Sequence, residues 1–172
     1  MKVMVTGERG YIGSVLVPIL KEKGYKVVGY DSGYFSENLL EQFDEDYLKI
    51  TKDIRDITRE DLKGVDAIIH LAGLSNDPLG EFSPKLTEDI NCNGTIRLAE
   101  MAKDVGISRF VYASSQSMYG VSNTTTELDE DDSEKNPVTA YAIAKWNAEQ
   151  QLHGMSTDDF VVTSLRPSTV FG

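Results

Sequence analysis

The sequence predicts an α/β protein whose core is a doubly wound, mostly parallel β-sheet. Along the whole chain, strand-like segments rich in β-branched and aromatic residues alternate with segments whose apolar residues recur at helical spacing. The first strand-like segment stops at a glycine and is followed at once by a helical pattern, which is the order of a βαβ unit. Because βαβ crossovers are right-handed and place helices on both faces of a sheet, we expect three layers, α/β/α.

Serine, proline and glycine mark where these elements begin and end. Ser83 and Pro84 are typical of an N-cap and a first helical position, and Gly24 and Gly106 are typical of helix ends. We expect strands over residues 2–6, 26–31, 47–50, 65–70, 109–115 and 160–165. We expect helices over residues 11–23, 84–105 and 140–153. The length of 172 residues and the unbroken alternation predict one domain over residues 1–172.

The composition argues for a folded, acidic protein without a nucleic-acid partner. Hydrophobic residues make up 40% of the chain, near the globular average, and the formal charge is −11. Binding to nucleic-acid phosphates needs a cationic face, and the sequence shows none. The acidic run from Glu127 to Glu134 is a solvated loop or, less favoured, a binding tail.

The single cysteine and the N-terminal pattern favour a cytoplasmic protein. Cys92 cannot form an intramolecular disulfide, so we interpret it as a small core residue in a reducing compartment. Residues 1–6 lack the charged-then-apolar pattern of a signal peptide, and no apolar run approaches the length of a membrane span. We therefore expect no membrane partner, and we assign no metal site.

A glycine-rich turn between the first strand and the first helix is a candidate phosphate site. Gly7, Gly10 and Gly13 are spaced Gly-x-x-Gly-x-x-Gly. Backbone N–H groups and the helix dipole at such a turn can hold a pyrophosphate, while the glycines permit the turn, the close approach of the backbone and tight helix packing. The alternative, a glycine-rich turn without a ligand, is disfavoured by the strand before it and the helix after it.

Asp31 ends the second predicted strand and is a candidate ribose ligand. A carboxylate there accepts hydrogen bonds from the adenosine ribose hydroxyls and repels a 2′-phosphate. This predicts NAD rather than NADP as the dinucleotide. The alternative is a charged residue that merely closes an exposed strand end.

Tyr141 and Lys145 are a candidate acid–base pair. Their separation of four residues on a predicted helix places both side chains on one face. A phenolate near neutral pH requires about 4 kcal/mol, and one cation about 4 Å away supplies energy of that order. An oxidised nicotinamide would add a second positive charge and couple proton transfer to redox chemistry. A surface helical pair without function is the competing interpretation of this spacing.

Together these motifs resemble those of the extended short-chain dehydrogenases/reductases, over the whole chain. Residues 6–13 match the family's Thr-Gly-x-x-Gly-x-x-Gly, and Tyr141-Ala142-Ile143-Ala144-Lys145 matches its Tyr-x-x-x-Lys. The resemblance implies a Rossmann fold that binds NAD. It implies the following cofactor contacts: Gly7, Gly10, Tyr11, Ile12, Gly13, Asp31, Leu71, Ala72, Gly73, Tyr141 and Lys145. It also implies that Asp53 and Ile54 contact the adenine.

The resemblance also implies two further catalytic residues. Ser115, four residues before Tyr119, matches the family's catalytic hydroxyl, with Ser114 and Ser117 as less favoured candidates. Asn91 completes the family's catalytic tetrad, although from the residues alone a helix-kinking or capping asparagine is equally plausible. His70 closes a buried strand, so a structural, hydrogen-bonded histidine is favoured over an acid or base, and we expect no catalytic role for it.

Within this superfamily the sequence is most similar to sugar-nucleotide 4-epimerases of the UDP-galactose epimerase type. Related 4,6-dehydratases carry Thr-Asp-Glu where Ser115-Gln116-Ser117 stands, so dehydration is disfavoured. Such epimerases usually carry Asn at the position of Thr169, which leaves a reductase or decarboxylase of the same superfamily open. A non-catalytic NAD-binding module is the alternative from another class.

The resemblance further implies a nucleotide-sugar substrate and a homodimer through the helices that carry Asn91 and Tyr141. Family members continue into a smaller C-terminal domain that grips the nucleotide-sugar, whereas this sequence stops at Gly172. We therefore expect the NAD-binding part of such an enzyme, truncated at its C-terminus and weak or inactive by itself, because proximity of bound reactants alone contributes about 7 kcal/mol or more.

Overall fold

A computed structural model describes residues 1–34, 46–121 and 127–171 and shows one parallel sheet. Its six strands follow the order β3-β2-β1-β4-β5-β6, and every neighbouring pair is parallel. The strands are β1 (Lys2–Thr6), β2 (Lys26–Asp31), β3 (Leu48–Thr51), β4 (Ala67–His70), β5 (Arg109–Ala113) and β6 (Val161–Leu165). The strand order reverses direction beside β1, which is the position where open α/β sheets bind ligands.

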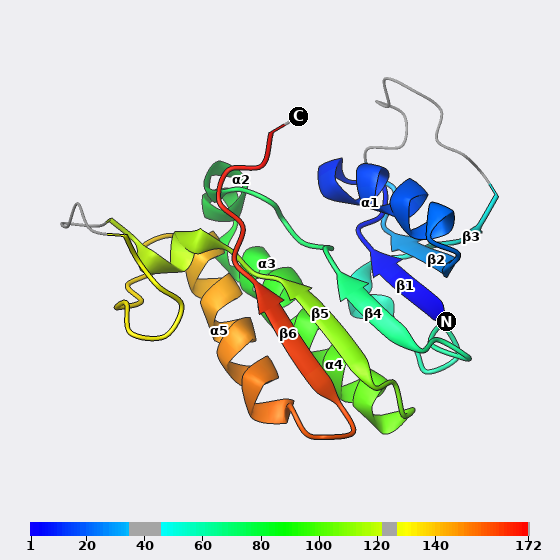
Figure 1. The fold of residues 1–172 in the computed structure, drawn as a ribbon. Helices are drawn as coiled ribbons and strands as arrows, with labels where there is room; N and C mark the ends of the chain where they lie inside the picture. Colours follow the sequence, from blue (N-terminus) through cyan, green and yellow to red (C-terminus); the bar gives the residue numbers. More distant parts are fainter. Residues whose placement is uncertain (35–45, 122–126, 172) are drawn as a thin grey trace.

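Helices cover the sheet on both faces. They are α1 (Tyr11–Glu22), α2 (Asp77–Phe82), α3 (Pro84–Glu88), α4 (Gly94–Asp104) and α5 (Ala140–Met155). Helix α1 lies on one face of the sheet, and α4 and α5 lie on the other (Figure 1). The predicted three-layer, doubly wound fold is therefore confirmed.

Two apolar clusters fill the space between these layers. Along β1, Val3 and Val5 belong to the cluster under α1, whereas Met4 belongs to the larger cluster beneath α4 and α5. This alternation follows from the two-residue period of a strand, which sends successive side chains to opposite faces. The sheet is thus anchored from both sides at its centre.

Two features of the α4 side differ from the predicted elements. The helix predicted over residues 84–105 is broken by a π-helical turn, Asp89–Asn93, between α3 and α4. A further short helix, α2, precedes it, and Asn76 caps this helix by accepting a hydrogen bond from the Leu79 N–H at 2.9 Å. Ser83 stands at the predicted N-cap of α3, but its hydroxyl makes no capping hydrogen bond.

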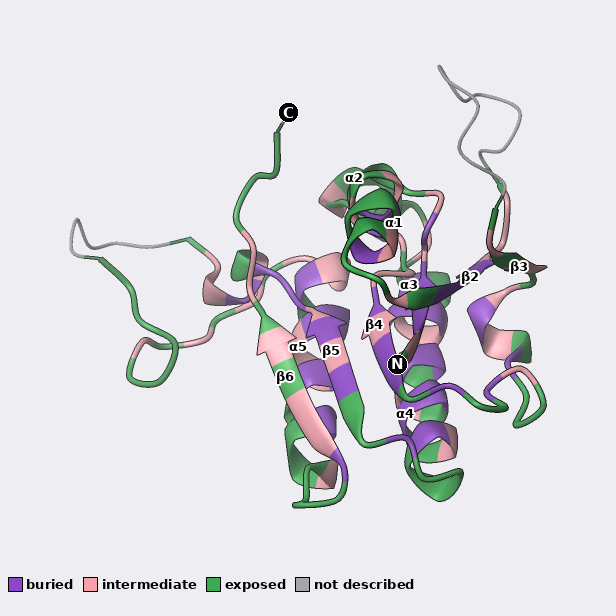
Figure 2. Ribbon diagram, turned by 45° about the vertical axis from the view of Figure 1, so that its right-hand side comes forward, coloured by how far each residue is buried: buried purple, intermediate pink, exposed green. Residues whose placement is uncertain are grey.

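The remaining sequence expectations concern the surface and the loops. The acidic run of residues 127–134 is mostly exposed, as expected of a solvated loop, and Cys92 is buried. Strand β5 contains buried residues, whereas every residue of β6 is intermediate or exposed (Figure 2). No helix in the described ranges is long and apolar enough to cross a bilayer. The polar stretch 35–45, part of the loop after Ser115 (122–126) and Gly172 lie outside the described residues.

A buried carboxylate lies beneath the glycine-rich turn. Glu8 is only 1% exposed, and neither of its carboxylate oxygens has a hydrogen-bond partner among the described residues. Its space exists because residue 29 is glycine: a Cβ added there would lie 2.6 Å from Glu8 Oε1. Burial and then the charge of Asp31 raise the pKa of Glu8 to about 7, although Arg9 Nε lies 3.3 Å from Oε1.

Replacing Glu8 with glutamine should stabilise the protein in a pH-dependent way. Because the pKa of about 7 in the folded chain exceeds the ordinary value of 4.5, ionisation destabilises the folded state as the pH rises through this window. Glu8→Gln should match the wild type below about pH 4 and exceed its free energy of unfolding by about 3 kcal/mol at about pH 8. Urea unfolding across this range measures the difference.

The exposed Glu60 provides the control for this experiment. Its side chain is 81% exposed, so Glu60→Gln should leave the pH dependence of the wild type unchanged. A difference between Glu8→Gln and the wild type that stays constant with pH would contradict the buried-carboxylate interpretation.

Candidate active site

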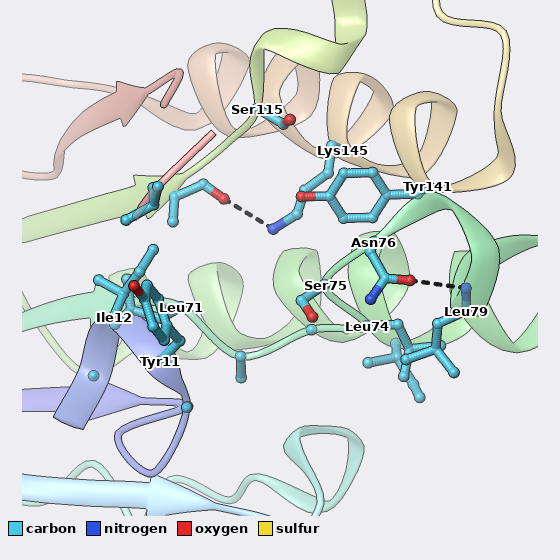
Figure 3. A pocket seen from close by; sticks show the side chains of 18 of the residues that line it. Tyr11, Ile12, Leu71, Leu74, Ser75, Asn76, Leu79, Ser115, Tyr141 and Lys145 are labelled. Carbon is cyan, nitrogen blue, oxygen red and sulfur yellow. Dashed lines mark hydrogen bonds between the residues drawn. The ribbon is translucent and has the colours of Figure 1, made fainter. Parts of the chain in front are cut away.

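A pocket of about 830 Å³ opens at the carboxyl ends of the strands. It extends from the glycine turn after β1 to the start of α5. In Figure 3, Tyr141, Lys145 and Ser115 lie opposite Ser75 and Asn76. Fourteen predicted site residues line it: Gly7, Gly10, Tyr11, Ile12, Gly13, Asp31, Asp53, Ile54, Leu71, Ala72, Gly73, Ser115, Tyr141 and Lys145. The fold therefore gathers residues that are more than a hundred positions apart in the sequence into one cavity.

The glycine turn leaves no room for side chains. Gly7 has a φ of 71°, and a Cβ added there would lie 2.8 Å from the backbone nitrogen of Ala72. A Cβ at Gly13 would lie 2.5 Å from the Cα of Glu8. The turn thus brings bare backbone and the N-terminus of α1 to the pocket wall, which is an environment suited to a pyrophosphate.

Asp31 lies beside this turn at the end of β2. Its carboxylate accepts hydrogen bonds from Gly33 N at 2.7 Å and from Arg9 N at 3.3 Å. The Arg9 side chain extends toward β3, where Nη2 donates to Thr51 Oγ1 at 2.9 Å. Asp31 is thus held by backbone donors at the end of β2, and its role as a ribose ligand stays a prediction.

The predicted adenine contacts, Asp53 and Ile54, lie at the same end of the pocket. Ile54 is buried, but the Asp53 carboxylate is already engaged by Arg55, whose Nη2 lies 2.7 Å from Oδ2. These hydrogen bonds from Arg55 lower the pKa of Asp53 to about 2 despite its partial burial. Asp53 is therefore a fixed anion beside the pocket.

Tyr141 and Lys145 occupy the first turns of α5, and both face the pocket. Thr139 caps this helix by accepting a hydrogen bond from Ala142 N at 3.1 Å. The Lys145 ammonium lies 5.9 Å from the centre of the Tyr141 ring and donates to the Ala113 carbonyl at 2.8 Å, as the dashed line in Figure 3 shows. The predicted same-face arrangement on a helix is confirmed.

Burial shifts the proton affinities of both groups. Burial lowers the pKa of the Lys145 ammonium to about 8, so the side chain remains mostly charged at neutral pH. Burial also raises the pKa of the Tyr141 phenol, and hydrogen bonding with Ser115 opposes part of that rise. The Asp77 charge adds to the rise. In this arrangement the phenol is the resting proton donor and Lys145 is the resident cation.

Ser115 is the candidate serine that hydrogen-bonds the Tyr141 phenol, and its catalytic role stays a prediction. It lies two residues after β5, lines the pocket, and its hydroxyl donates to Ser117 Oγ at 3.0 Å. Ser114 and Ser117 also line the pocket, so all three candidates face it. Tyr119 is not among the residues that line the pocket, and its hydroxyl accepts a hydrogen bond from Arg166 Nη1 at 2.7 Å.

Asn91 lies in the π-helical turn and, unlike the other predicted site residues, does not line the pocket. Its side-chain amide pairs with the backbone of Leu74 instead: Oδ1 accepts from Leu74 N at 2.8 Å, and Nδ2 donates to Leu74 O at 2.9 Å. The irregular turn agrees with the helix-kinking interpretation of this asparagine. Its catalytic role stays a prediction.

Sequence reasoning missed two segments of the pocket wall. The segment 75–79, at the start of α2, lines the pocket, and so do Pro167, Ser168 and Val170 beside Thr169. Helix α2 packs closely on the predicted tyrosine, since a Cβ at Gly80 would lie 3.0 Å from Tyr141 Cβ. The signal was present in Asn76-Asp77-Pro78, an N-cap followed by proline in the first turn.

Comparisons with known proteins agree with this geometry. The NAD dependent epimerase/dehydratase family matches residues 3–172. UDP-glucose 4-epimerase of Mycolicibacterium smegmatis is 32% identical over 182 residues, which cover 100% of this chain and 57% of that protein. UDP-glucuronic acid decarboxylase 4 of Arabidopsis thaliana is 32% identical over 122 residues, which cover 70% of this chain and 27% of that protein.

A solved structure supports the same assignment. MoeE5 in complex with UDP-glucuronic acid and NAD superimposes with a TM-score of 0.82 at 27% identity, over 96% of this chain and 54% of that one. The chain spans about half the length of the curated relatives that it matches. The family match over nearly the whole chain, together with the shared fold, shows that this chain belongs to the NAD-dependent epimerase/dehydratase family of the short-chain dehydrogenase/reductase superfamily.

Proposed function

We propose that residues 1–172 form the NAD-binding and proton-transfer part of a nucleotide-sugar epimerase. The observation that carries this proposal is one continuous pocket that joins the two kinds of site. The glycine turn and Asp31 lie at one end, and Ser115, Tyr141 and Lys145 lie at the other. This is the arrangement needed to hold an extended dinucleotide with its reactive ring beside a proton donor and acceptor.

The fit to NAD rests on the backbone and on one charge. The bare turn at Gly7 and Gly13 and the N-terminus of α1 suit the pyrophosphate, and Asp31 suits ribose hydroxyls. Bound NAD would supply the acceptor for the two electrons removed from a ring alcohol. The relatives support this assignment, since MoeE5 is described with NAD and a UDP-sugar.

The residues of this chain would move the proton. In the oxidation, Tyr141 as phenolate takes the proton of a sugar hydroxyl while that carbon becomes a ketone; in the return step the phenol gives the proton back after reduction from the other face. Lys145 holds a positive charge beside the phenolate, and Ser115 hydrogen-bonds the reacting oxygen. No net oxidation remains, so the overall reaction is an isomerisation.

The alternatives within the family differ in what happens after the oxidation. Dehydration needs an additional acid and base near the sugar, yet the pocket-lining segment Ala113–Ser117 carries only neutral side chains. A decarboxylase remains a competing proposal, because one relative has that name. A non-catalytic NAD-binding module is the outcome that a lack of turnover would support.

Removal of the Tyr141 hydroxyl tests the catalytic proposal. Tyr141→Phe should bind NAD as the wild type does but lose about 10²- to 10⁴-fold in the rate of the redox step, because it lacks the group that takes the proton. Reduced cofactor and sugar products formed from UDP-glucose or UDP-glucuronic acid are measured by absorbance and chromatography.

Tyr119→Phe is the matched control, since Tyr119 does not line the pocket and should keep the wild-type rate. NAD binding without any sugar-dependent reduction in the complete natural protein would contradict the catalytic proposal. A decarboxylated product would instead favour the competing subclass.

Asp31 tests the choice of dinucleotide. We expect the wild type to bind NAD more tightly than NADP, because the Asp31 charge repels a 2′-phosphate. Asp31→Asn keeps an acceptor for Gly33 N but removes the charge, so the preference for NAD should fall at least about tenfold. Calorimetric titration gives both affinities.

Asp104→Asn serves as the control, because Asp104 pairs with Arg59 on the surface at the end of α4 and lies away from the pocket lining. It should leave the ratio of NAD to NADP affinities unchanged. Equal affinities for the two dinucleotides in the wild type would contradict the assigned role of Asp31.

We also propose a homodimer through the helices that carry Asn91 and Tyr141. Several apolar side chains on this side of the sheet are exposed: Phe82 is 89% exposed, and Leu86 and Ile143 are each 40% exposed. They lie on α2, α3 and α5, which contact one another. A second copy would cover them at little cost, since apolar area removed from water stabilises an interface.

Sedimentation equilibrium tests the dimer. The wild type should sediment as a dimer, and Phe82→Lys should weaken association because it places a charge in the apolar contact. Val15→Lys changes a residue that is 62% exposed on α1, on the opposite face of the sheet, and should leave the dimer intact. A wild-type monomer at all concentrations would contradict the proposal.

A further inference from the structure

His70 is a fully buried titratable residue beside the pocket that the proposed reaction does not use. It ends β4 and is 0% exposed, with the Tyr112 ring stacked at 5.9 Å from its own. Both ring nitrogens have hydroxyl partners: Nδ1 lies 2.6 Å from Thr6 Oγ1, and Nε2 lies 2.8 Å from Thr95 Oγ1. The ring therefore connects the end of β1 to the beginning of α4.

The hydrogen bonds around His70 favour one tautomer of its ring. When Thr95 Oγ1 donates its one proton to the Asn91 carbonyl at 2.8 Å, it accepts from His70, and Nε2 carries the ring proton. In the neutral ring Nδ1 is then an acceptor, and Thr6 Oγ1 donates to it while accepting from Ala72 N at 3.3 Å. A charged imidazole would leave the Thr6 proton without this acceptor.

The charges near His70 agree with a neutral ring. Burial, followed by the charge of Lys145, lowers its pKa to about 3. The rings of Phe110 and Tyr112 face it from β5 and carry no charge near neutral pH. The imidazole of His70 is therefore neutral near neutral pH.

The hydrogen bonds of His70 belong to a chain of contacts that begins and ends in the segment 71–74. It begins at Ala72 N and reaches the Asn91 carbonyl through Thr6, His70 and Thr95. From there the Asn91 side chain makes its two hydrogen bonds to the Leu74 backbone. The ring of contacts closes on the segment 71–74, all of which lines the pocket.

The segment 71–74 packs closely against the elements on both of its sides. A Cβ on Gly7 would lie 2.8 Å from Ala72 N on one side, and a Cβ on Gly73 would lie 2.9 Å from Asn91 Oδ1 on the other. A displacement of the π-helical turn would move the segment 71–74 against the glycine turn at Gly7. The hydrogen bonds of His70 span these two flanking elements.

We propose that His70, as a neutral Nε2–H imidazole between Thr6 and Thr95, is a positioning residue for the dinucleotide pocket. It holds the segment 71–74 at a fixed distance from the Gly7 turn and couples that turn to the π-helical turn of Asn91. This inference rests on the proposed function for the identity of the ligand, NAD. The hydrogen-bonding arrangement itself does not depend on that function.

Nitrogen-15 NMR of the histidine side chains tests the arrangement without any ligand. We expect the Nε2–H tautomer for His70, with no titration between about pH 5 and pH 8, whereas an ordinary histidine titrates there. His153 is the other histidine of the chain and serves as the internal comparison. Its ring is exposed and lies 3.2 Å from Ser164 Oγ. An Nδ1–H tautomer or an imidazolium in this range would overturn the proposal.

Variants of Thr95 test whether the arrangement serves the pocket. Thr95→Val removes the contact to His70 and the donor to Asn91, so NAD should bind about tenfold more weakly, equivalent to about 1.4 kcal/mol. Hydrogen exchange at Leu74 N should also accelerate. Thr95→Ser keeps the hydroxyl and should restore both measurements.

Ile107→Val provides the control for lost stability, since Ile107 is buried outside the pocket lining. If Thr95→Val and Ile107→Val weaken NAD binding equally, His70 is merely structural and the proposal fails. If the wild type does not bind NAD, the proposed function fails, while the NMR tautomer and the Leu74 exchange still decide the arrangement.

Discussion

The close approach of two backbone segments, the Gly7 turn and the segment 71–74, is the constraint on which the rest of the site depends. These segments meet at a distance that no side chain at Gly7 would permit. Strands β1 and β4 are neighbours in register, with Thr6 opposite His70, so their carboxyl ends deliver the two segments side by side. The pairing of β1 with β4 therefore determines the backbone geometry of the pocket floor, and the side chains of the site are positioned around this backbone.

The same burial that shapes the pocket opposes the chemistry assigned to it. Tyr141 is harder to ionise than a free tyrosine, and Lys145 is a weaker base than a free lysine. With a pKa of about 8, Lys145 still carries most of its charge at neutral pH. Because it stands alone as a cation beside the phenol among the described contacts, a second positive charge from an oxidised nicotinamide would act in the same direction. Proton transfer would then depend on the redox state of the bound cofactor.

Much of this site could be predicted because its determinants are local. The spacing of Gly7, Gly10 and Gly13 and the helical interval from Tyr141 to Lys145 can be identified without knowledge of the tertiary fold. The ends of all six strands were predicted to within two residues, since the buried apolar runs are distinct. What escaped prediction depends on partners distant in sequence. The π-helical turn of Asn91 is stabilised by hydrogen bonds to Leu74, and no helical periodicity encodes such a partner.

The burial of Glu8 is a second feature that could not be predicted from local sequence. A glutamate in a glycine-rich turn has the sequence signature of an exposed loop, yet it is buried because Gly29, on the next strand, leaves a space of its size. The burial places a titratable group behind the glycine turn, where the charge of Asp31 raises its pKa. The electrostatic environment of Asp31 is thus set partly by a buried residue that does not line the pocket. A change at residue 29 would alter this environment without touching any residue that lines the pocket.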